Sequence, residues 1–425
     1  MKNIFSIFVI FLFLFSFRLP LFYNSAFLSI FLIFIGCLFI VRKEQSFFLH
    51  NCKKILLDRS TLLLIFSIII ICIVSLVYPL LTETYDFTIL STLLNQFISI
   101  FLALILVSYF NIDKTHSVIE FIIFAFVIQS LIQLTAFLYT PFFEFVKLFQ
   151  SETAIEIGET YGGGGMRAVA ISGSQFFGLS ASYGFVFLLF FNYLVTKRRT
   201  SITDLVIFSL LVVGTIFSGR TGFVGLAAAL CYSFVVSQRR LLVLGFISKL
   251  TLFSFVVVNL LVAFVLDPER VLYIKNVLFP WAFEFIYSVI RTGSIETRSS
   301  SGLINHYFWL DDIDYIIGMG LNKVYLSDAG YMRNLIYGGV SWLFLLSIYQ
   351  IQLFIALIRK DKSRKLFFIV LCMFIFVLHY KGEAVGFLLM IQKMIFMILF
   401  STILYNKRDY HEKNSDLYRD NLVKS

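Results

Sequence analysis

Five arginines next to apolar stretches are the residues best suited to chemistry in this sequence. They are Arg167, Arg220, Arg291, Arg298 and Arg333. A guanidinium group holds a phosphate through two parallel hydrogen bonds, which the ammonium group of lysine does not reproduce. The five residues therefore predict a site for a phosphate-bearing substrate. The alternative is that each arginine extends to the phosphates of membrane lipids.

Arg220 is the first of these candidates because of the turn that holds it. The sequence FSGRTGFVG leaves only Ser218, Gly219 and Arg220 between two apolar stretches. Such a short turn is not a free loop, so the guanidinium group must lie at the mouth of a helical bundle. We expect Arg220 to be pre-oriented for bidentate phosphate binding.

Smaller polar groups surround Arg167. The glycines at 162–165 can form an amide nest for an anion, or simply a flexible loop. Ser172, Ser174 and Gln175 follow at the start of an apolar stretch. Their hydroxyl and amide groups fit a sugar or a phosphate, and they equally fit a helix cap.

Asp328 is the candidate general base. It precedes an apolar stretch and lies five residues from Arg333, where a carboxylate can accept a proton from a sugar hydroxyl. A helix cap or an ion pair with Arg333 is the alternative role. No metal site is predicted, because Asp312 and Asp314 form an isolated pair, best explained as a solvated acidic turn. His306, next to aromatic residues, is expected to be packed or interfacial.

Lys393 is the one charged residue deep inside an apolar stretch. A charge at the centre of a membrane helix costs about 2.5–3.5 kcal/mol on insertion scales, so we expect Lys393 to face the bundle interior and to be functional. Gln129 and Gln133, four residues apart on one helix face, are expected to face the same interior.

Composition places these residues in a helical membrane protein. Hydrophobic residues make up 59% of the 425 residues and charged residues only 14%. The net charge of +10 does not indicate nucleic-acid binding, because most basic residues fall in short loops between apolar stretches. The five cysteines lie in apolar or basic stretches, so no disulfide is expected.

Twelve apolar stretches predict transmembrane helices in a single all-α integral membrane domain over residues 1–425, with both termini cytoplasmic. The predicted spans are 4–17, 21–41, 61–81, 89–109, 118–139, 174–195, 205–218, 221–237, 250–266, 334–358, 366–380 and 384–405. The first lacks a small-residue cleavage site, so it is predicted to be a retained span.

Two enlarged loops are predicted on the outer, periplasmic side, at 140–173 and 267–333. The second contains the apolar stretch Val271–Ile290, in which two charges and a proline argue against a thirteenth span. We expect this stretch to form an interfacial or re-entrant helix, with Trp281 and Tyr287 at the depth of the lipid head groups.

Four segments, spread over most of the chain, resemble the O-antigen polymerase (Wzy) family, within the O-antigen polymerase/ligase superfamily. GMRAVAISGSQFFG has an arginine, Arg167, that is followed after ten residues by Gly178, and RTGSIETRSSSG has the same spacing from Arg291 to Gly302 in the second enlarged loop. FSGRTGFVG resembles the Ser-Arg-Thr turn of the family, and GMGLNKVYLSDAGYMRNLIYGG resembles its closing Gly-x-Gly loop. Related ligases carry a His-Asn pair where this chain has Asp328, which favours a polymerase.

The resemblance implies a GT-C-like bundle in the bacterial inner membrane that acts as a glycosyltransferase in lipopolysaccharide biosynthesis, without cofactor or metal. It implies an inverting transfer of a growing glycan from undecaprenyl pyrophosphate onto a lipid-linked repeat unit at the periplasmic face. The implied partners are the lipid-linked oligosaccharide, membrane lipid and a chain-length regulator protein. The implied substrate-binding residues are Arg167, Arg220, Arg291, Arg298 and Arg333, with Arg220 and Asp328 catalytic.

Two other functions stay open at this point. One is an O-antigen ligase, and the other is a flippase or secondary transporter of a lipid-linked oligosaccharide. A transporter predicts pseudo-symmetric halves and polar groups near the middle of the membrane, which the sequence largely lacks.

Overall fold

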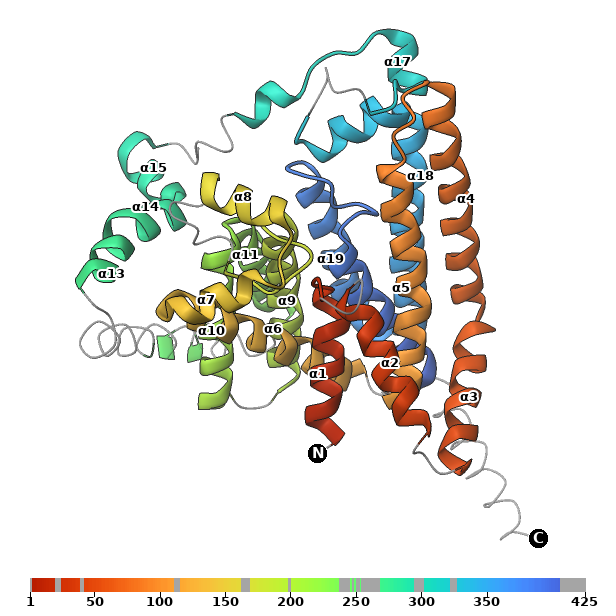
Figure 1. Cartoon of the computed structure of the whole chain (residues 1–425), viewed down its shortest axis with the longest axis horizontal. Helices are drawn as coiled ribbons and strands as arrows, with labels where there is room; N and C mark the ends of the chain where they lie inside the picture. Colours follow the sequence, from red (N-terminus) through yellow and green to blue (C-terminus); the bar gives the residue numbers. More distant parts are fainter. Residues whose placement is uncertain are drawn as a thin grey trace.

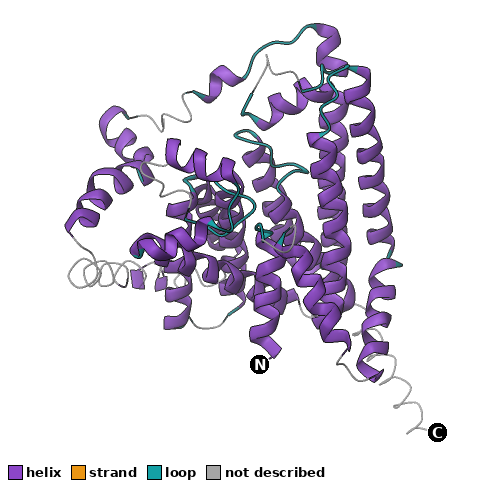
Figure 2. Ribbon diagram, in the orientation of Figure 1, coloured by secondary structure: helices purple, strands orange, loops and turns teal. Residues whose placement is uncertain are grey.

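The computed structural model describes residues 2–19, 24–38, 42–110, 115–161, 169–197, 200–236, 245–246, 248–249, 253, 268–293, 302–321 and 327–405, all in helices or loops (Figure 2). The first helices are α1 (Lys2–Phe15), α2 (Ser25–Leu38), α3 (Arg42–Leu56), α4 (Arg59–Leu81), α5 (Thr88–Phe110), α6 (Thr115–Leu138), α7 (Thr140–Lys147) and α8 (Glu152–Tyr161). They are followed by α9 (Phe177–Thr196), α10 (Ile202–Ser218), α11 (Thr221–Val236), α13 (Pro268–Tyr273), α14 (Phe279–Ala282), α15 (Glu284–Thr292), α17 (Asp312–Ile317), α18 (Gly330–Lys360) and α19 (Lys365–His379). A last helix covers Leu389–Tyr405.

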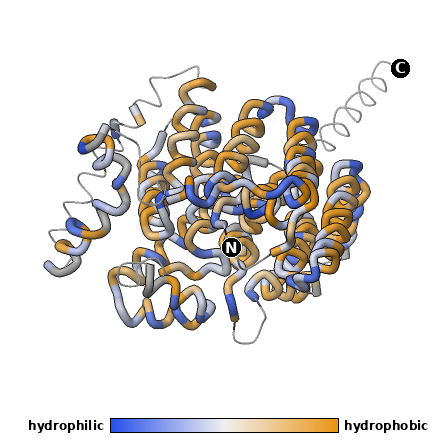
Figure 3. The backbone as a smooth tube through the Cα atoms, turned by 90° about the horizontal axis from the view of Figure 1, so that it is seen from above, coloured by the Kyte–Doolittle hydropathy of each residue, from blue (hydrophilic) through white to orange (hydrophobic). Residues whose placement is uncertain are grey.

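Five of the described helices are long and apolar enough to cross a membrane. They are Arg59–Leu81, Thr88–Phe110, Ser117–Leu138, Phe177–Thr196 and Gly330–Lys360. Every predicted span overlaps a described helix except 250–266, which lies outside the described residues apart from Phe253. Helices suit lipid because each satisfies its backbone hydrogen bonds within itself. The all-α class is thus confirmed for the described chain. Most of its helices consist largely of hydrophobic residues (Figure 3).

The helical bundle has two different ends (Figure 1). At the end where α4 begins and α18 ends, which we call the basic end, Lys360 Nζ donates to Asp58 Oδ2 at 2.6 Å. The opposite end holds the start of α18.

α9 is deeply buried, since every residue from Gly178 to Asn192 is buried, as is every residue from Met390 to Leu404 in the last helix. It packs closely against α11, where a Cβ on Gly225 would lie only 2.3 Å from the Cα of Gly184. Glycine contacts that let two backbones approach in this way are typical of membrane helix pairs. The packing fixes the position of the turn that precedes α11.

α1 and α2 form a hairpin that is shorter than its neighbours. Each has 14 residues, whereas α5 has 23. At 1.5 Å per residue each helix of the hairpin is about 21 Å long. α1 ends at Phe15 because other elements satisfy its last carbonyls: Ser25 Oγ donates to Leu12 O at 2.7 Å, and Gly173 N donates to Phe15 O at 2.8 Å. The hairpin therefore stops short of the end of the bundle where α5 begins (Figure 1).

The predicted interfacial helix over Val271–Ile290 is broken into four pieces. α13 continues into a π-helix, Ile274–Leu278, and α14 and α15 follow with Phe283 between them. Pro280 explains the π-helix, because proline lacks an N–H and its ring clashes with the carbonyl four residues earlier, at Asn276. α13 to α15 lie at one side of the bundle (Figure 1).

Near its start, α18 bends at Gly338 and Gly339, and the segment after α17 fills the bend. Met319 N donates to Ile336 O at 2.7 Å. Gly339 has a φ of 65°, and a Cβ there would lie 2.3 Å from Ile316 O. The bend therefore requires glycine and fixes the first turns of α18 against the segment from Ile316 to Met319.

Candidate functional site

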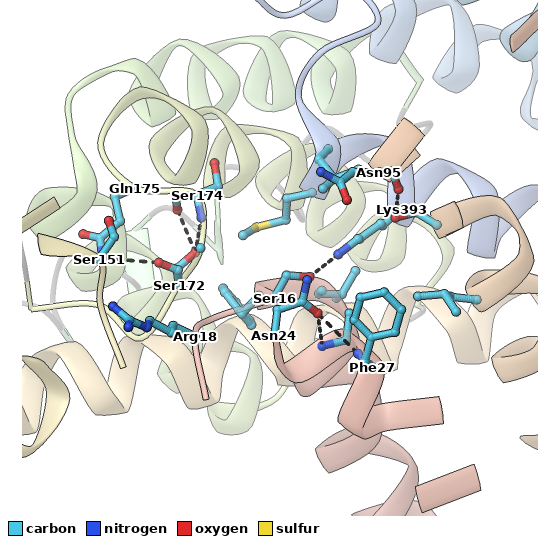
Figure 4. A pocket seen from close by; sticks show the side chains of 18 of the residues that line it. Ser16, Arg18, Asn24, Phe27, Asn95, Ser151, Ser172, Ser174, Gln175 and Lys393 are labelled. Carbon is cyan, nitrogen blue, oxygen red and sulfur yellow. Dashed lines mark hydrogen bonds between the residues drawn. The ribbon is translucent and has the colours of Figure 1, made fainter. Parts of the chain in front are cut away.

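A cavity of about 920 Å³ lies where the hairpin of α1 and α2 ends (Figure 4). Its walls come from the end of α1, the start of α2, the middle of α5, the segments 149–154 and 172–175, and the start of the last helix. The polar lining residues are Ser16, Arg18, Asn24, Asn95, Ser99, Ser151, Ser172, Ser174, Gln175 and Lys393. No acidic residue is among the described residues that line it. Two cations with amides and hydroxyls favour an anionic ligand that is rich in hydroxyl groups.

Lys393 faces this cavity, which confirms the prediction that it points into the bundle interior. It is 1% exposed. Its Nζ donates to Phe13 O at 2.7 Å and to Ser16 Oγ, and lies 4.9 Å from the centroid of the Phe13 ring. Phe13 O is one of the last four carbonyls of α1, so Lys393 complements the negative end of the helix dipole. Among the described residues, no carboxylate balances its charge.

Three further donors line the cavity, and the sequence did not identify them as site residues. Arg18 follows α1 and is exposed. Asn24 Oδ1 accepts from Ala26 N at 3.0 Å, which caps α2 and leaves the NH₂ group of Asn24 for a ligand. Asn95 lies in the middle of α5, where no hydrogen bond of its side chain is found among the described residues. What these three residues share is that they lie near the end of a hairpin that is too short to span the bundle.

Ser172, Ser174 and Gln175 lie in the cavity wall rather than in a helix cap. The N-cap of α9 is Phe176, without a side-chain hydrogen bond. Ser172 Oγ donates to Ser174 O at 2.7 Å, and Gln175 Nε2 donates to Ser172 O at 3.3 Å. The buried Oε1 of Gln175 has no hydrogen-bond partner in the described chain. A buried acceptor without a donor is a suitable contact for a sugar hydroxyl.

Arg220 occupies the predicted turn, and a carboxylate of the protein already binds it. It forms an ion pair with Glu284 of α15, and its Cζ lies 5.2 Å from the centroid of the Trp281 ring. The Arg220 side chain is 15% exposed. Ser180 helps to fix the turn, because Gly222 N donates to its Oγ at 2.8 Å. Glu284 binds only Nη1 of the guanidinium group, so a phosphate can reach Arg220 through its remaining N–H groups or in place of Glu284.

Arg333 is also paired, since its Nε lies 3.3 Å from Glu383 Oε2. Burial raises the pKa of Glu383 above its ordinary value, although Arg333 acts in the opposite direction. Asp328 is exposed, and its backbone N donates to His306 Nδ1 at 3.3 Å. Ala329 is the N-cap of α18. The alternative roles of Asp328, a cap or a partner of Arg333, are therefore not observed among the described residues.

The other predicted residues lie away from the cavity or outside the described residues. Arg291 is exposed in the last turn of α15. Arg167 and Arg298 lie outside the described residues. Asp312 and Asp314 lie in the first turn of α17. None of the described arginines that the sequence identified lines the cavity.

Gln129 and Gln133 face the interior of the bundle, as predicted, and both are fully buried. Gln133 Nε2 donates to Ser218 Oγ at 3.0 Å, and Tyr183 OH donates to Gln133 Oε1 at 2.9 Å. These groups join α6 to α9 and α10, which is typical of polar side chains between membrane helices. They stabilise the bundle and do not line the cavity.

No family model matches this chain, and no curated protein matches it. The function therefore has to be argued from the cavity, the charges around it and the resemblance of short motifs.

Proposed function

We propose that this protein is an O-antigen polymerase of the bacterial inner membrane. It would transfer a growing glycan from undecaprenyl pyrophosphate onto a lipid-linked repeat unit at the periplasmic face. The observation that carries the proposal is the cavity, where two cations, amides and hydroxyls surround a space without a carboxylate among its described lining residues. A lipid-linked oligosaccharide presents a pyrophosphate and many hydroxyl groups, and it matches this lining in charge and in hydrogen bonding.

The proposed reaction breaks the bond between the anomeric carbon and a pyrophosphate oxygen, and forms a bond from that carbon to the acceptor hydroxyl. Negative charge develops on the leaving pyrophosphate. Fixed cations stabilise such charge strongly in a site that excludes water. Lys393 supplies the buried cation for this charge, and Arg18 adds an exposed cation on the other side of the cavity. The proton of the acceptor hydroxyl passes to a base, for which we propose Asp328.

The outer arginines keep supporting roles in this proposal. Arg220 does not line the cavity, so in this proposal it contacts a phosphate of the substrate outside the cavity. Arg167, Arg291, Arg298 and Arg333 contact the glycan from the enlarged loops. The basic end faces the cytoplasm, together with both termini, because loops rich in Lys and Arg stay on that side. A chain-length regulator protein is a proposed partner.

The test uses purified protein and synthetic undecaprenyl-pyrophosphate-linked repeat units, in the presence of a chelator. We expect a ladder of longer chains, since no step requires a metal. Movement of the lipid-linked unit across proteoliposomes without a ladder would instead assign a flippase. Transfer onto a lipid A core acceptor, but not onto repeat units, would assign a ligase.

A further inference from the structure

The cavity has two chemically different sides. Figure 4 shows Asn24, Phe27, Asn95 and Lys393 on one side, and Ser151, Ser172, Ser174, Gln175 and Arg18 on the other. The first side combines one buried cation with two amides and apolar groups. The second combines hydroxyl and amide groups with the exposed Arg18. A ligand that fills the cavity therefore meets different chemistry at its two ends.

The Lys393 side reaches the apolar surface of the bundle between α2 and α5. Phe27 of α2 is 40% exposed and Ile98 of α5 is 36% exposed, although both line the cavity. Both helices are strongly apolar, so in a membrane these two side chains face hydrocarbon. Phe27 and Ile98 therefore mark the side of the cavity that lies next to the apolar surface of the bundle.

Donors for a phosphate gather on this side of the cavity. An ammonium group has three N–H donors, and Lys393 uses two of them on Phe13 O and Ser16 Oγ. The amide of Asn95 has no partner among the described residues, and the NH₂ group of Asn24 is left by its capping bond. These groups offer a phosphate one charged and two neutral donors on the side that lies next to the apolar surface.

We propose that the cavity holds a polyprenyl pyrophosphate in one orientation. The tail leaves between Phe27 and Ile98, the phosphates bind Lys393 with the amides of Asn24 and Asn95, and the first sugar lies against the segment 172–175. The choice of ligand rests on the proposed function, whereas the orientation follows from the exposed apolar side chains next to the buried cation.

Lys393 also supports the end of α1, and this structural role has a matched control. Lys54 Nζ donates to Leu404 O, near the end of the last helix, at 3.1 Å and lies outside the cavity. Lys393→Met and Lys54→Met each remove a lysine that bonds a helix carbonyl. Only Lys393→Met removes a cation from the cavity, so the comparison separates ligand binding from helix support.

The experiment measures binding of undecaprenyl pyrophosphate, undecaprenol and inorganic pyrophosphate to the full chain in detergent, by native mass spectrometry. We expect undecaprenyl pyrophosphate to bind most tightly and undecaprenol not to bind. Lys393→Met should lower the affinity for undecaprenyl pyrophosphate about tenfold or more, the loss of a charge-assisted hydrogen bond, while Lys54→Met leaves it unchanged. Equal affinities of the two variants would overturn the proposal.

Two more variants test the orientation and guard against misfolding. Ile98→Trp narrows the proposed tail exit, so it should weaken the binding of undecaprenyl pyrophosphate but not that of inorganic pyrophosphate. Equal binding of the two ligands by the unmodified chain would refute the tail position. If Lys393→Met does not fold, Asn95→Leu takes its place, and unchanged affinity of that variant counts against the site. If the lipid binds but no ladder forms, the polymerase activity is rejected and the binding site stands. If a ladder forms and Lys393→Met binds the lipid normally, the activity stands and the binding site is rejected.

Discussion

Two groups of cations in this protein differ in what balances their charge. Arg220 and Arg333 each pair with a glutamate, Glu284 and Glu383. Lys393 instead contacts a carbonyl, a hydroxyl and an aromatic ring. A cation that is already paired gains little free energy when it binds an anionic ligand, whereas a buried cation without a counter-charge gains more. Of these three cations, Lys393 is therefore more available to a phosphate than the arginine that the motifs favour.

The largest effect on turnover is expected at a carboxylate, because the acids also divide into paired and unpaired groups. Glu284 and Glu383 are engaged in ion pairs, and Asp328 is exposed without a partner among the described residues. Asp328→Asn keeps the shape but cannot accept a proton. If Asp328 is the base, turnover falls about 10²–10⁴-fold, as measured by ladder formation at matched expression, while donor binding survives. Near-normal polymerisation would remove Asp328 from the mechanism.

The next effect concerns the cavity cation. Lys393→Met should lower ladder formation about 10²–10³-fold, the usual consequence of removing one donor to charge that develops in the transition state. The control is Lys54→Met, which should retain activity at matched membrane expression. A similar loss in both variants would show that Lys393 only supports α1, and the contrast between paired and unpaired cations would fail.

A smaller effect is expected at Arg220. Arg220→Lys keeps a cation for Glu284, so we expect less than about a tenfold loss of activity if the ion pair is the main role of Arg220. A bidentate phosphate clamp predicts instead a loss of about 10²–10³-fold, because lysine lacks the planar fork. Ladder formation by Arg220→Lys and Arg220→Ala decides between these roles, with expression of each variant matched by immunoblot.

The smallest effect is a change of stability with pH at Glu383. Its pKa is raised in the folded protein, so the folded state binds this proton more tightly than the unfolded chain. The stabilisation is present below the unfolded pKa, about 4.3, and is lost as the pH rises through the folded value. Glu383→Gln lacks this dependence, so its unfolding temperature should rise relative to the unmodified chain between acid and neutral pH. The opposite trend would show that the ion pair with Arg333 outweighs burial.

The sequence by itself determined the class of protein and the interior position of several polar groups. Long apolar stretches leave helices as the structure that satisfies the backbone in lipid. Lys393, Gln129 and Gln133 had to face the interior, because a charge or an amide is unfavourable against hydrocarbon. The short turn at Arg220 also followed from the sequence, since only three residues separate two apolar stretches.

Only the tertiary structure decided which of these groups share a site. Glu284 lies 64 positions from Arg220, and Lys393 meets Ser16 across 377 positions. Spacing along the chain carries no information about such contacts, because they depend on how helices of different length pack. The cavity exists because the hairpin of α1 and α2 stops short of the end of the bundle where α5 begins. This difference in length leaves Arg18, Asn24 and Asn95 around one space. Charge pairing, and with it the availability of each cation, is fixed by that packing.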